Sequence, residues 1–216
     1  MRTKLITHFL SLFLFVSSIS FANPKITNDQ DPEKDKVLIS VLNYMLTQGH
    51  YNQKVLNDDF SEMVFNNFIA DLDPSKRYFT KIDIKEFSKY KYQIDNQLKE
   101  SDIAFYSLVY GRFLEKIKNA KNYYNTILKK PFNYKKDEVI DLDFKVIDYA
   151  KTEKELLNFW RKQLKLQTID KIRDQENLDE EEFKKDQSFK KRSFSILEKK
   201  ARADVMESME NLYIRI

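Results

Sequence analysis

One segment sets the organisation of the chain, and it reads Leu72-Asp73-Pro74-Ser75-Lys76-Arg77-Tyr78-Phe79-Thr80-Lys81-Ile82-Asp83. Proline disfavours helical backbone at the residue before it and suits the second position of a type I turn, so Asp73-Pro74 should end a helix. Thr80, with Asp83 three residues later, resembles a capping box in which Asp replaces the usual Glu. The segment therefore predicts a helix end, a turn and a new helix in close succession.

Upstream of this turn, apolar residues recur at the spacing of one helical face, which predicts two helices. The nearer helix should run from about Asp58 to Leu72. Its expected buried face is Phe60, Met63, Val64, Phe68 and Leu72. The earlier helix should begin at Asp31-Pro32, a cap residue followed by proline, and end at Gly49 in a left-handed conformation. Its expected face is Val37, Leu38, Val41, Leu42, Met45 and Leu46.

Two further helices are expected directly downstream of the turn. The third helix should continue from the Thr80 cap on a single apolar face, formed by Ile84, Phe87, Tyr90, Ile94 and Leu98. Ser101-Asp102 should cap a long fourth helix that reaches about Lys130, just before Pro131. The face of this long helix is Ile103, Tyr106, Val109, Tyr110, Phe113, Leu114, Ile117, Tyr124 and Leu128.

Beyond Pro131 the pattern is less regular. Residues 132–149 hold only short apolar pairs and should be extended or irregular. Thr152 to Glu155 forms a capping box and should open a fifth helix with Leu156, Leu157, Trp160 and Leu164 on its apolar face. The charge-dense stretch 173–185 indicates a solvated helix or connector. The last apolar face is Phe189, Phe194, Leu197, Val205, Met206, Met209, Leu212 and Tyr213, and it continues to the final residues as in a chain cut short.

The composition supports a helical fold. The chain holds only two Gly and four Pro in 216 residues, which is poor material for β-hairpins or phosphate-binding loops. We therefore predict an all-α fold, an irregular bundle of about six to seven helices with long central helices and no substantial sheet. Residues 1–22 should form a signal peptide, 23–32 a flexible leader and 33–216 one helical domain.

The first residues have the layout of a secretory signal peptide. Arg2 and Lys4 precede an apolar run, and Ser20-Phe21-Ala22 places small residues before a cut near Ala22. The apolar run is about 15 residues long, shorter than the roughly 20 that a membrane-spanning helix needs. We therefore expect an exported protein with no membrane span after cleavage. Loss of Arg2 and Lys4 leaves the basic residues almost balanced by acidic ones, which argues against a nucleic-acid partner.

Few residues are suited to catalysis or metal binding. The chain has no Cys, and after cleavage its only His is His50, which is far more often a packing or capping residue than a base when it stands alone. Metal sites usually bring together several His, Cys or carboxylate ligands, so we predict no metal and no cofactor. The acidic run 179–182 is better explained as a solvated helix face. The residues alone nominate no catalytic group.

Several residues in their order resemble one family, the N-terminal helical domain of tail-specific, or carboxy-terminal-processing, proteases. The strongest match is the block from Leu72 through Asp73, Pro74 and Tyr78 to Phe79, followed by Asp83. Weaker matches in the same order are His50, Tyr51, Ile84, Phe87, Tyr90, Asp95, Arg112, Pro131 to Tyr134, Trp160, Arg161, Lys165, Arg192, Asp204 and Val205. The resemblance implies structural roles for these residues.

The resemblance also implies a function. Proteases of this family that carry such a domain are periplasmic enzymes of Gram-negative bacteria, which bind apolar C-terminal tails through a PDZ domain and cleave with a Ser-Lys dyad. The helical domain would then be a non-catalytic scaffold and docking surface. Its partners would be the PDZ and peptidase domains, and a periplasmic adaptor protein. No nucleophilic Ser or catalytic Lys transfers to this sequence, so we expect no hydrolysis by this chain alone. The alternative is a free-standing periplasmic helical adaptor or chaperone-like module.

Overall fold

The computed structural model describes residues 32–49, 51 and 53–214, and this part of the chain is mainly helical, with irregular connections between the helices. It contains seven α-helices and no strand, with one isolated bridge between Thr80 and Ala150. The helices are α2 (Pro32–Tyr44), α3 (Asp58–Leu72), α4 (Lys81–Phe87), α5 (Ile94–Glu100), α6 (Ala104–Ile127), α7 (Glu153–Lys185) and α8 (Phe194–Ile214). The predicted all-α class is confirmed. The predicted signal peptide, the leader up to residue 31, and His50 lie outside the described residues.

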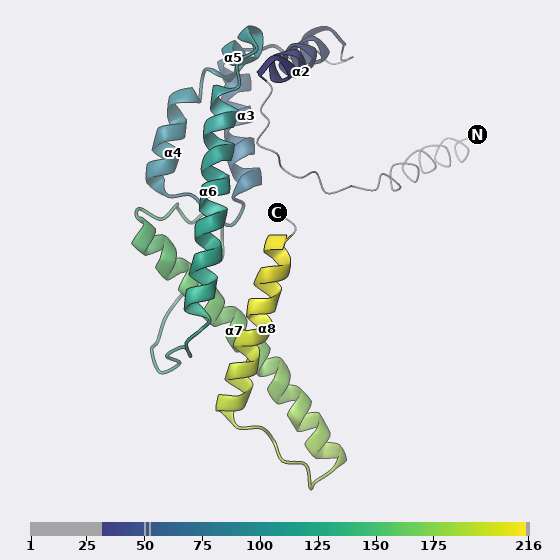
Figure 1. The fold of residues 1–216 in the computed structure, drawn as a ribbon, viewed down its shortest axis with the longest axis vertical. Coiled ribbons are helices and arrows are strands. Elements are labelled where there is room, and N and C mark those ends of the chain that lie inside the picture. The colour runs from purple at the N-terminus through teal and green to yellow at the C-terminus, as the bar shows by residue number, and fades with distance from the viewer. Residues whose placement is uncertain (1–31, 50, 52, 215–216) are drawn as a thin grey trace, which may run out of the picture.

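Helix α6 runs between the other helices of the bundle (Figure 1). It contributes side chains to two hydrophobic cores. One half of α6 packs with α3, α4 and α5 around Phe65, Phe79, Phe87 and Val109. The other half packs with α7 and α8 around Trp160, together with other aromatic and aliphatic residues. Phe113 contacts both cores, so α6 joins the two halves of the bundle.

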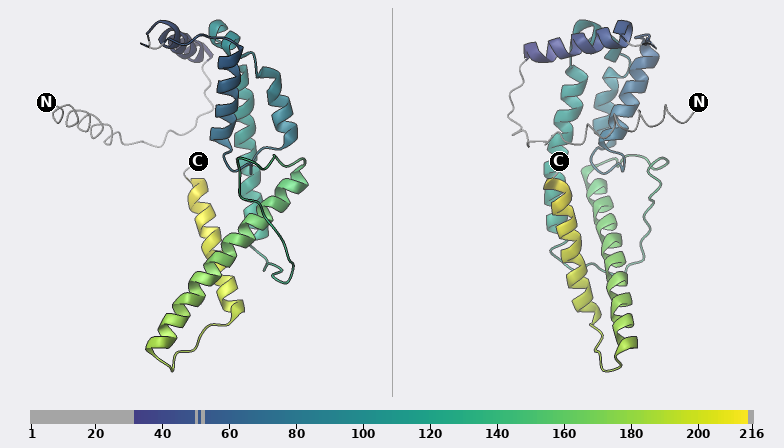
Figure 2. Two further views of the ribbon diagram at one scale, coloured as in Figure 1. Left: turned by 180° about the vertical axis from the view of Figure 1, so that it is seen from behind. Right: turned by 90° about the vertical axis from the view of Figure 1, so that its right-hand side faces the viewer.

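Helices α7 and α8 continue beyond this bundle as a pair of antiparallel helices (Figure 2). A third, small cluster holds them together, where Ile172 of α7 meets Leu197 and Ala201 of α8, with Tyr134 against it. The charged stretch 173–185 is the last part of α7 and is helical as expected. It is not solvated on all sides, because Gln175 and Asp179 are buried and Asp179 pairs with Arg192. Phe189 lies in the connection before α8, and Phe194 is half exposed, so the buried face of α8 starts only at Leu197.

The predicted third helix is wrong in its continuity. The chain forms α4, a 3-10 turn at Ser88–Tyr90 and then a separate helix α5. A turn before α5 lets the backbone N–H of Asp95 donate to the Ser61 hydroxyl, at 2.9 Å, while that hydroxyl donates to the Asp95 carboxylate at 2.8 Å. This buried link to α3 is not available to a helix that continues straight from α4.

The predicted cap of the fourth helix is half wrong. Ser101 adopts a left-handed conformation with φ of 57° and ends α5 instead of capping α6. The free N–H groups at the start of α6 are satisfied by two other side chains. The carboxylate of Asp102 accepts from Ala104, and the amide oxygen of Gln97 accepts from Phe105, each at 3.1 Å.

The bounds of α3 and the start of α7 are as predicted, but details differ. Met63 is half exposed, while Phe65 and Ile69 supply the buried face of α3 because the link between Ser61 and Asp95 turns that side inward. At α7, Thr152 caps the Glu155 N–H as expected. The Glu155 carboxylate accepts from the N–H of Lys151 rather than that of Thr152, so the box is not closed. Leu157, predicted on the apolar face of this helix, is exposed.

The expected buried face of the first helix is wrong. Helix α2 lies across one end of the bundle (Figure 2), and Val37, Leu38 and Val41 are all more than half exposed. A different side of α2 faces the bundle, and Ile39 on that side is only partly exposed. A π-helical turn, Met45–Gly49, follows α2, and no described glycine has positive φ, so the left-handed end predicted at Gly49 is also wrong.

Candidate functional site

The turn between α3 and α4 is organised by one buried carboxylate. Asp73 is 1% exposed and accepts hydrogen bonds from the backbone N–H groups of Arg77 (2.8 Å), Tyr78 (3.0 Å) and Phe79 (2.9 Å). Lys76 adopts a positive φ of 49°, which lets the chain curl around the carboxylate. Burial raises the pKa of Asp73 even though these three hydrogen bonds favour its ionised form.

The same turn contacts α7 and α8. The indole N–H of Trp160 in α7 donates to the carbonyl oxygen of Arg77 at 2.7 Å. The guanidinium of Arg77 lies over the rings of both Trp160 and Tyr78. The hydroxyl of Tyr78 is 3.0 Å from the hydroxyl of Tyr213 near the end of α8. Three segments that are distant in sequence therefore meet at this turn.

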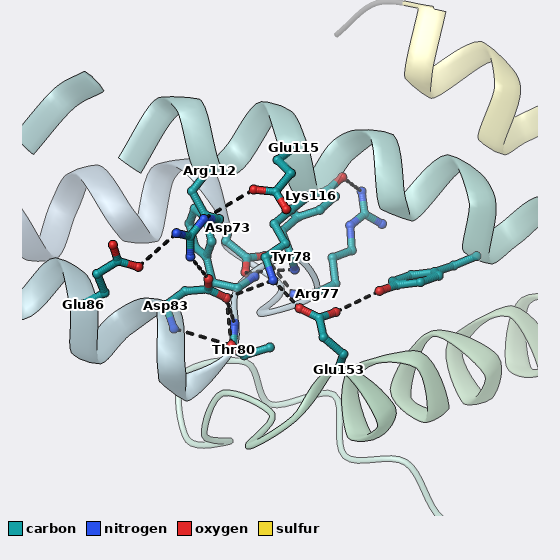
Figure 3. A network of polar contacts seen from close by, with 12 residues as sticks. Asp73, Arg77, Tyr78, Thr80, Asp83, Glu86, Arg112, Glu115, Lys116 and Glu153 are labelled. Atoms are coloured by element: carbon teal, nitrogen blue, oxygen red, sulfur yellow. Dashed lines mark hydrogen bonds and ion pairs between the residues drawn. The ribbon is translucent and has the colours of Figure 1, made fainter. Parts of the chain in front are cut away.

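Asp83 connects the start of α4 to α6 (Figure 3). Its carboxylate accepts from the backbone N–H of Thr80 at 2.8 Å and from its hydroxyl at 2.7 Å, which completes the predicted capping box. Arg112 of α6 bonds to the other carboxylate oxygen, and Lys116 lies 3.1 Å away. Burial opposes ionisation here too, but the hydrogen bonds from Thr80, Arg112 and Lys116 lower the pKa of Asp83.

The network around Asp83 continues into α7. Lys116, which is largely buried, also pairs with Glu153 in the first turn of α7, and Tyr123 donates to the other Glu153 oxygen at 2.8 Å. Burial and this hydrogen bond raise the pKa of Tyr123 to about 12. We call the ionic part of this network the Asp83 cluster. Its members are Asp83, Glu86, Arg112, Glu115, Lys116 and Glu153.

A second ionic cluster lies where the irregular segment 132–149 crosses α7. The carboxylate of Glu138, 9% exposed at its side chain, pairs with Arg161 in a two-pronged contact and with Lys165 at 3.0 Å. Lys136 lies 3.1 Å from the same carboxylate. Hydrogen bonds from Arg161 and Lys165 lower the pKa of Glu138. We call these four residues the Glu138 cluster.

The predicted residues fall in different parts of the structure. We call the turn between α3 and α4, with its contacts to α6, α7 and α8, the junction. It holds six of the predicted residues: Asp73, Tyr78, Phe79, Asp83, Arg112 and Trp160. Leu72, the last residue of α3, and Pro74, an exposed turn residue, flank it. Arg161 belongs to the Glu138 cluster instead. Tyr51 lies in the connection before α3 and is 97% exposed. His50 is not among the residues that the structure describes.

Sequence reasoning missed Lys116, Glu153 and Glu138. One signal was available, because Arg112 and Lys116 stand four residues apart, as do Arg161 and Lys165. That spacing places two cations on one face of a helix, where they can reach a single carboxylate. The identity of that carboxylate could not be predicted, since it comes from a segment 23 to 33 residues away in the chain.

These arrangements offer hydrogen bonding, ion pairing and packing. Within residues 32–49, 51 and 53–214, no three His, Cys, Asp or Glu side chains are placed to hold a metal ion. In the same ranges, no helix is long and apolar enough to cross a membrane. The fold and its junction define a helical domain in which buried polar contacts fix how the helices meet.

The chain belongs to the family described as tail-specific protease N-terminal domain, whose profile matches residues 41–213. It is similar to the tail-specific protease of Haemophilus influenzae (strain ATCC 51907 / DSM 11121 / KW20 / Rd), with 29% identity over 131 residues. The matched part is 60% of this chain and 19% of that relative, so the chain spans well under half of the relative's length.

Proposed function

We propose that this chain is the non-catalytic helical domain of a tail-specific protease, and that it acts as a scaffold for the parts of such an enzyme that bind and cleave protein tails. The observation that carries the proposal is the junction at Asp73 and Asp83. It joins α3, α4, α6, α7 and α8 through buried contacts, and Asp73, Asp83 and Trp160 at its centre belong to the family motif. Such a junction suits a rigid support.

The exposed face of α2 supports a docking role within the same proposal. Val37, Leu38, Val41 and Leu42 form a row of exposed apolar side chains along this helix, and the exposed Met45 follows them at the start of the π-helical turn. Contiguous apolar surface of this kind marks a contact site for another polypeptide. We propose the PDZ and peptidase domains of a tail-specific protease as partners, together with a periplasmic adaptor protein.

A chimera tests the scaffold role. Residues 41–213 would replace the corresponding region of the Haemophilus influenzae relative, and cleavage of a reporter peptide with an apolar C-terminal tail would be measured. We expect the chimera to cleave faster than the relative with that region deleted, and the isolated chain to cleave nothing. Cleavage by the isolated chain, or a chimera no better than the deletion, would overturn the proposal.

We also propose export to the periplasm after removal of residues 1–22. The supporting observations are the charged start, the short apolar run and the small residues before Asn23. Expression of the whole chain in a Gram-negative host, followed by fractionation and N-terminal sequencing, tests this. A periplasmic product that begins at Asn23 is the expected result, and a cytoplasmic product that begins at Met1 would contradict it.

A further inference from the structure

The Glu138 cluster carries more positive than negative charge. Lys136, Arg161 and Lys165 converge on the one carboxylate of Glu138, and no other acidic side chain is paired with these cations among the described residues. Lys165 is nearly buried, with its side chain 9% exposed. Cations that are withdrawn from water without a matching anion are costly, and a bound anion lowers that cost.

Backbone carbonyl oxygens compensate part of this excess positive charge. The ammonium of Lys165 donates to the carbonyl oxygens of Asn133 (2.8 Å) and Lys136 (3.2 Å) as well as to Glu138. All three of its hydrogens are therefore used, and its role is to fasten segment 132–149 to α7. Arg161 is used in a similar way, since it bonds to both oxygens of Glu138 and to the Asn158 side chain. The cations left with free donor capacity are the neighbouring lysines.

Those lysines line a groove between the irregular segment and α7. A hollow of about 360 Å³ is lined by Lys135, Lys136, Lys162 and Lys165. Lys162 donates one hydrogen bond, to the carbonyl oxygen of Val139 at 2.7 Å, and its ammonium has two further hydrogens. Among the described residues, two acidic ones, Asp137 and Glu138, line the same hollow against four lysines, so its described lining has a net positive charge.

The groove continues past Lys162, where the charge of its lining residues changes. A second hollow of about 250 Å³ shares Val139, Ile140 and Lys162 with the first, and so adjoins it. Its other lining includes Phe159 and the acidic residues Asp141, Asp148 and Glu155. The walls of both hollows are partly apolar, and Val139 is 81% exposed. The groove is therefore positive at one end, apolar along its length and more acidic at the other end.

We propose that this groove binds an extended polypeptide segment that places an acidic side chain at Lys135, Lys136 and Lys162 and apolar side chains along Val139 and Ile140. A small anion would use only the positive end, whereas the adjoining hollow, with its partly apolar walls, matches a longer chain with side chains of both kinds. The inference rests on the docking role proposed above and names the chemistry of one partner. It concerns a face of α7 distinct from the exposed row on α2.

The test is direct binding to the purified chain, measured by fluorescence anisotropy. The probe is a fluorescein-labelled twelve-residue peptide of alternating Glu and Val, and the comparison peptide has Lys in place of Glu. We expect saturable binding of the Glu peptide that weakens as NaCl is raised, because exposed charges are screened by salt. We expect no binding of the Lys peptide. Binding of both peptides alike would overturn the proposal.

Matched variants locate the site. Lys136→Gln with Lys162→Gln should weaken the Glu peptide about fivefold, the effect of losing two exposed ion pairs. Lys171→Gln is the control, since nine residues along α7 place it on the opposite side of the helix from Lys162. Circular dichroism checks that each variant is folded. If the double variant is not folded, the exposed Lys135→Gln replaces it. If Lys171→Gln weakened binding of the Glu peptide as much as the double variant does, the proposed location of the site would be wrong.

Two further binding experiments test for a small anion and for a membrane surface as the ligand of the groove. Inorganic phosphate that displaces the Glu peptide at equal charge concentration would show an anion site only, and binding to phosphatidylglycerol–phosphatidylcholine vesicles without peptide binding would show a membrane surface. Either result overturns the proposal. Failure of peptide binding would leave the chimera assay unaffected, and failure of the chimera would leave peptide binding unaffected. The two proposals can therefore fail separately.

Discussion

Two carboxylates in this molecule are held in the same way, each by an arginine and a lysine four residues apart on one helix. Asp83 meets its pair on α6, and Glu138 meets its pair on α7. Both carboxyl groups have lowered pKa values. The surroundings differ, because carboxylates outnumber cations in the Asp83 cluster, whereas three cations surround a single carboxylate in the Glu138 cluster.

The difference shows that the segment supplying the carboxylate decides what the pair of cations does. Asp83 lies in the first turn of α4, and its carboxylate is already bonded to Thr80 as part of a capping box. The ion pairs then fix the position of α4 against α6, in the interior. Glu138 comes from an irregular segment with no helix to cap, so its ion pairs attach a surface segment and leave neighbouring lysines open to a partner. One cluster serves the fold, and the other serves recognition.

The largest expected effect is the loss of Asp83. Asp83→Ala removes the carboxylate half of the capping box of α4 and leaves Arg112 and Lys116 without their buried partner. Breaking a buried ion pair in this way costs about 3–5 kcal/mol of unfolding free energy. Urea unfolding followed by circular dichroism measures it.

Glu138→Ala is the matched comparison for this measurement. Its carboxylate lies nearer the surface and caps no helix, so a smaller loss of stability is expected. Equal losses at the two positions would break the distinction between an interior cluster and a surface cluster.

A second, smaller effect is expected at Asp73. Asp73→Asn keeps one oxygen acceptor but turns an NH2 group toward backbone N–H groups that the carboxylate now satisfies. Loss of buried hydrogen bonds of this kind costs about 2 kcal/mol. The same urea titration reports the change, with Asp71→Asn on the exposed side of α3 as the control. An unchanged midpoint would show that the turn does not depend on this carboxylate.

The pH dependence of stability gives a third test. The pKa of Asp83 is lowered below its ordinary value near 3.8, so its contribution to stability is present above that pH and is lost as the pH falls through the folded-state pKa. Unfolding free energy should therefore decrease on acidification below about pH 4. Asp83→Asn should make this decrease shallower. A variant with the same slope as the parent chain would place the acid-sensitive group elsewhere.

Local signals predicted the helices better than their contacts. The cap at Thr80 and Asp83 and the ends of α3 depend on neighbouring residues, and both were readable from the sequence. The break before α5 was not, because its cause is a hydrogen bond between Ser61 and Asp95, 34 residues apart. The direction of the apolar face of α2 was also unreadable, since a helix with apolar residues on several sides can turn any of them inward.

In the candidate site, too, local signals were readable from the sequence and contacts between distant residues were not. Sequence order placed Asp73, Tyr78 and Trp160 in one motif, but gave no distances between them. Their meeting depends on where α7 crosses α6, which is set by packing in the core around Trp160. Glu138 lacked any local signal because its segment has neither a helical period nor a cap. Tertiary contacts between distant segments therefore account for what the sequence left open.

The smallest effect concerns the hydroxyls of Tyr78 and Tyr213, which connect the junction to α8. Tyr78→Phe keeps the ring packing and removes one member of the buried pair, which should cost about 1 kcal/mol. Tyr213→Phe should cost a similar amount. The double variant should cost less than the two single losses combined, since neither hydroxyl is then left buried without the other. Strict additivity in urea unfolding would show that the two hydroxyls do not interact, and that α8 is held to the junction by packing alone.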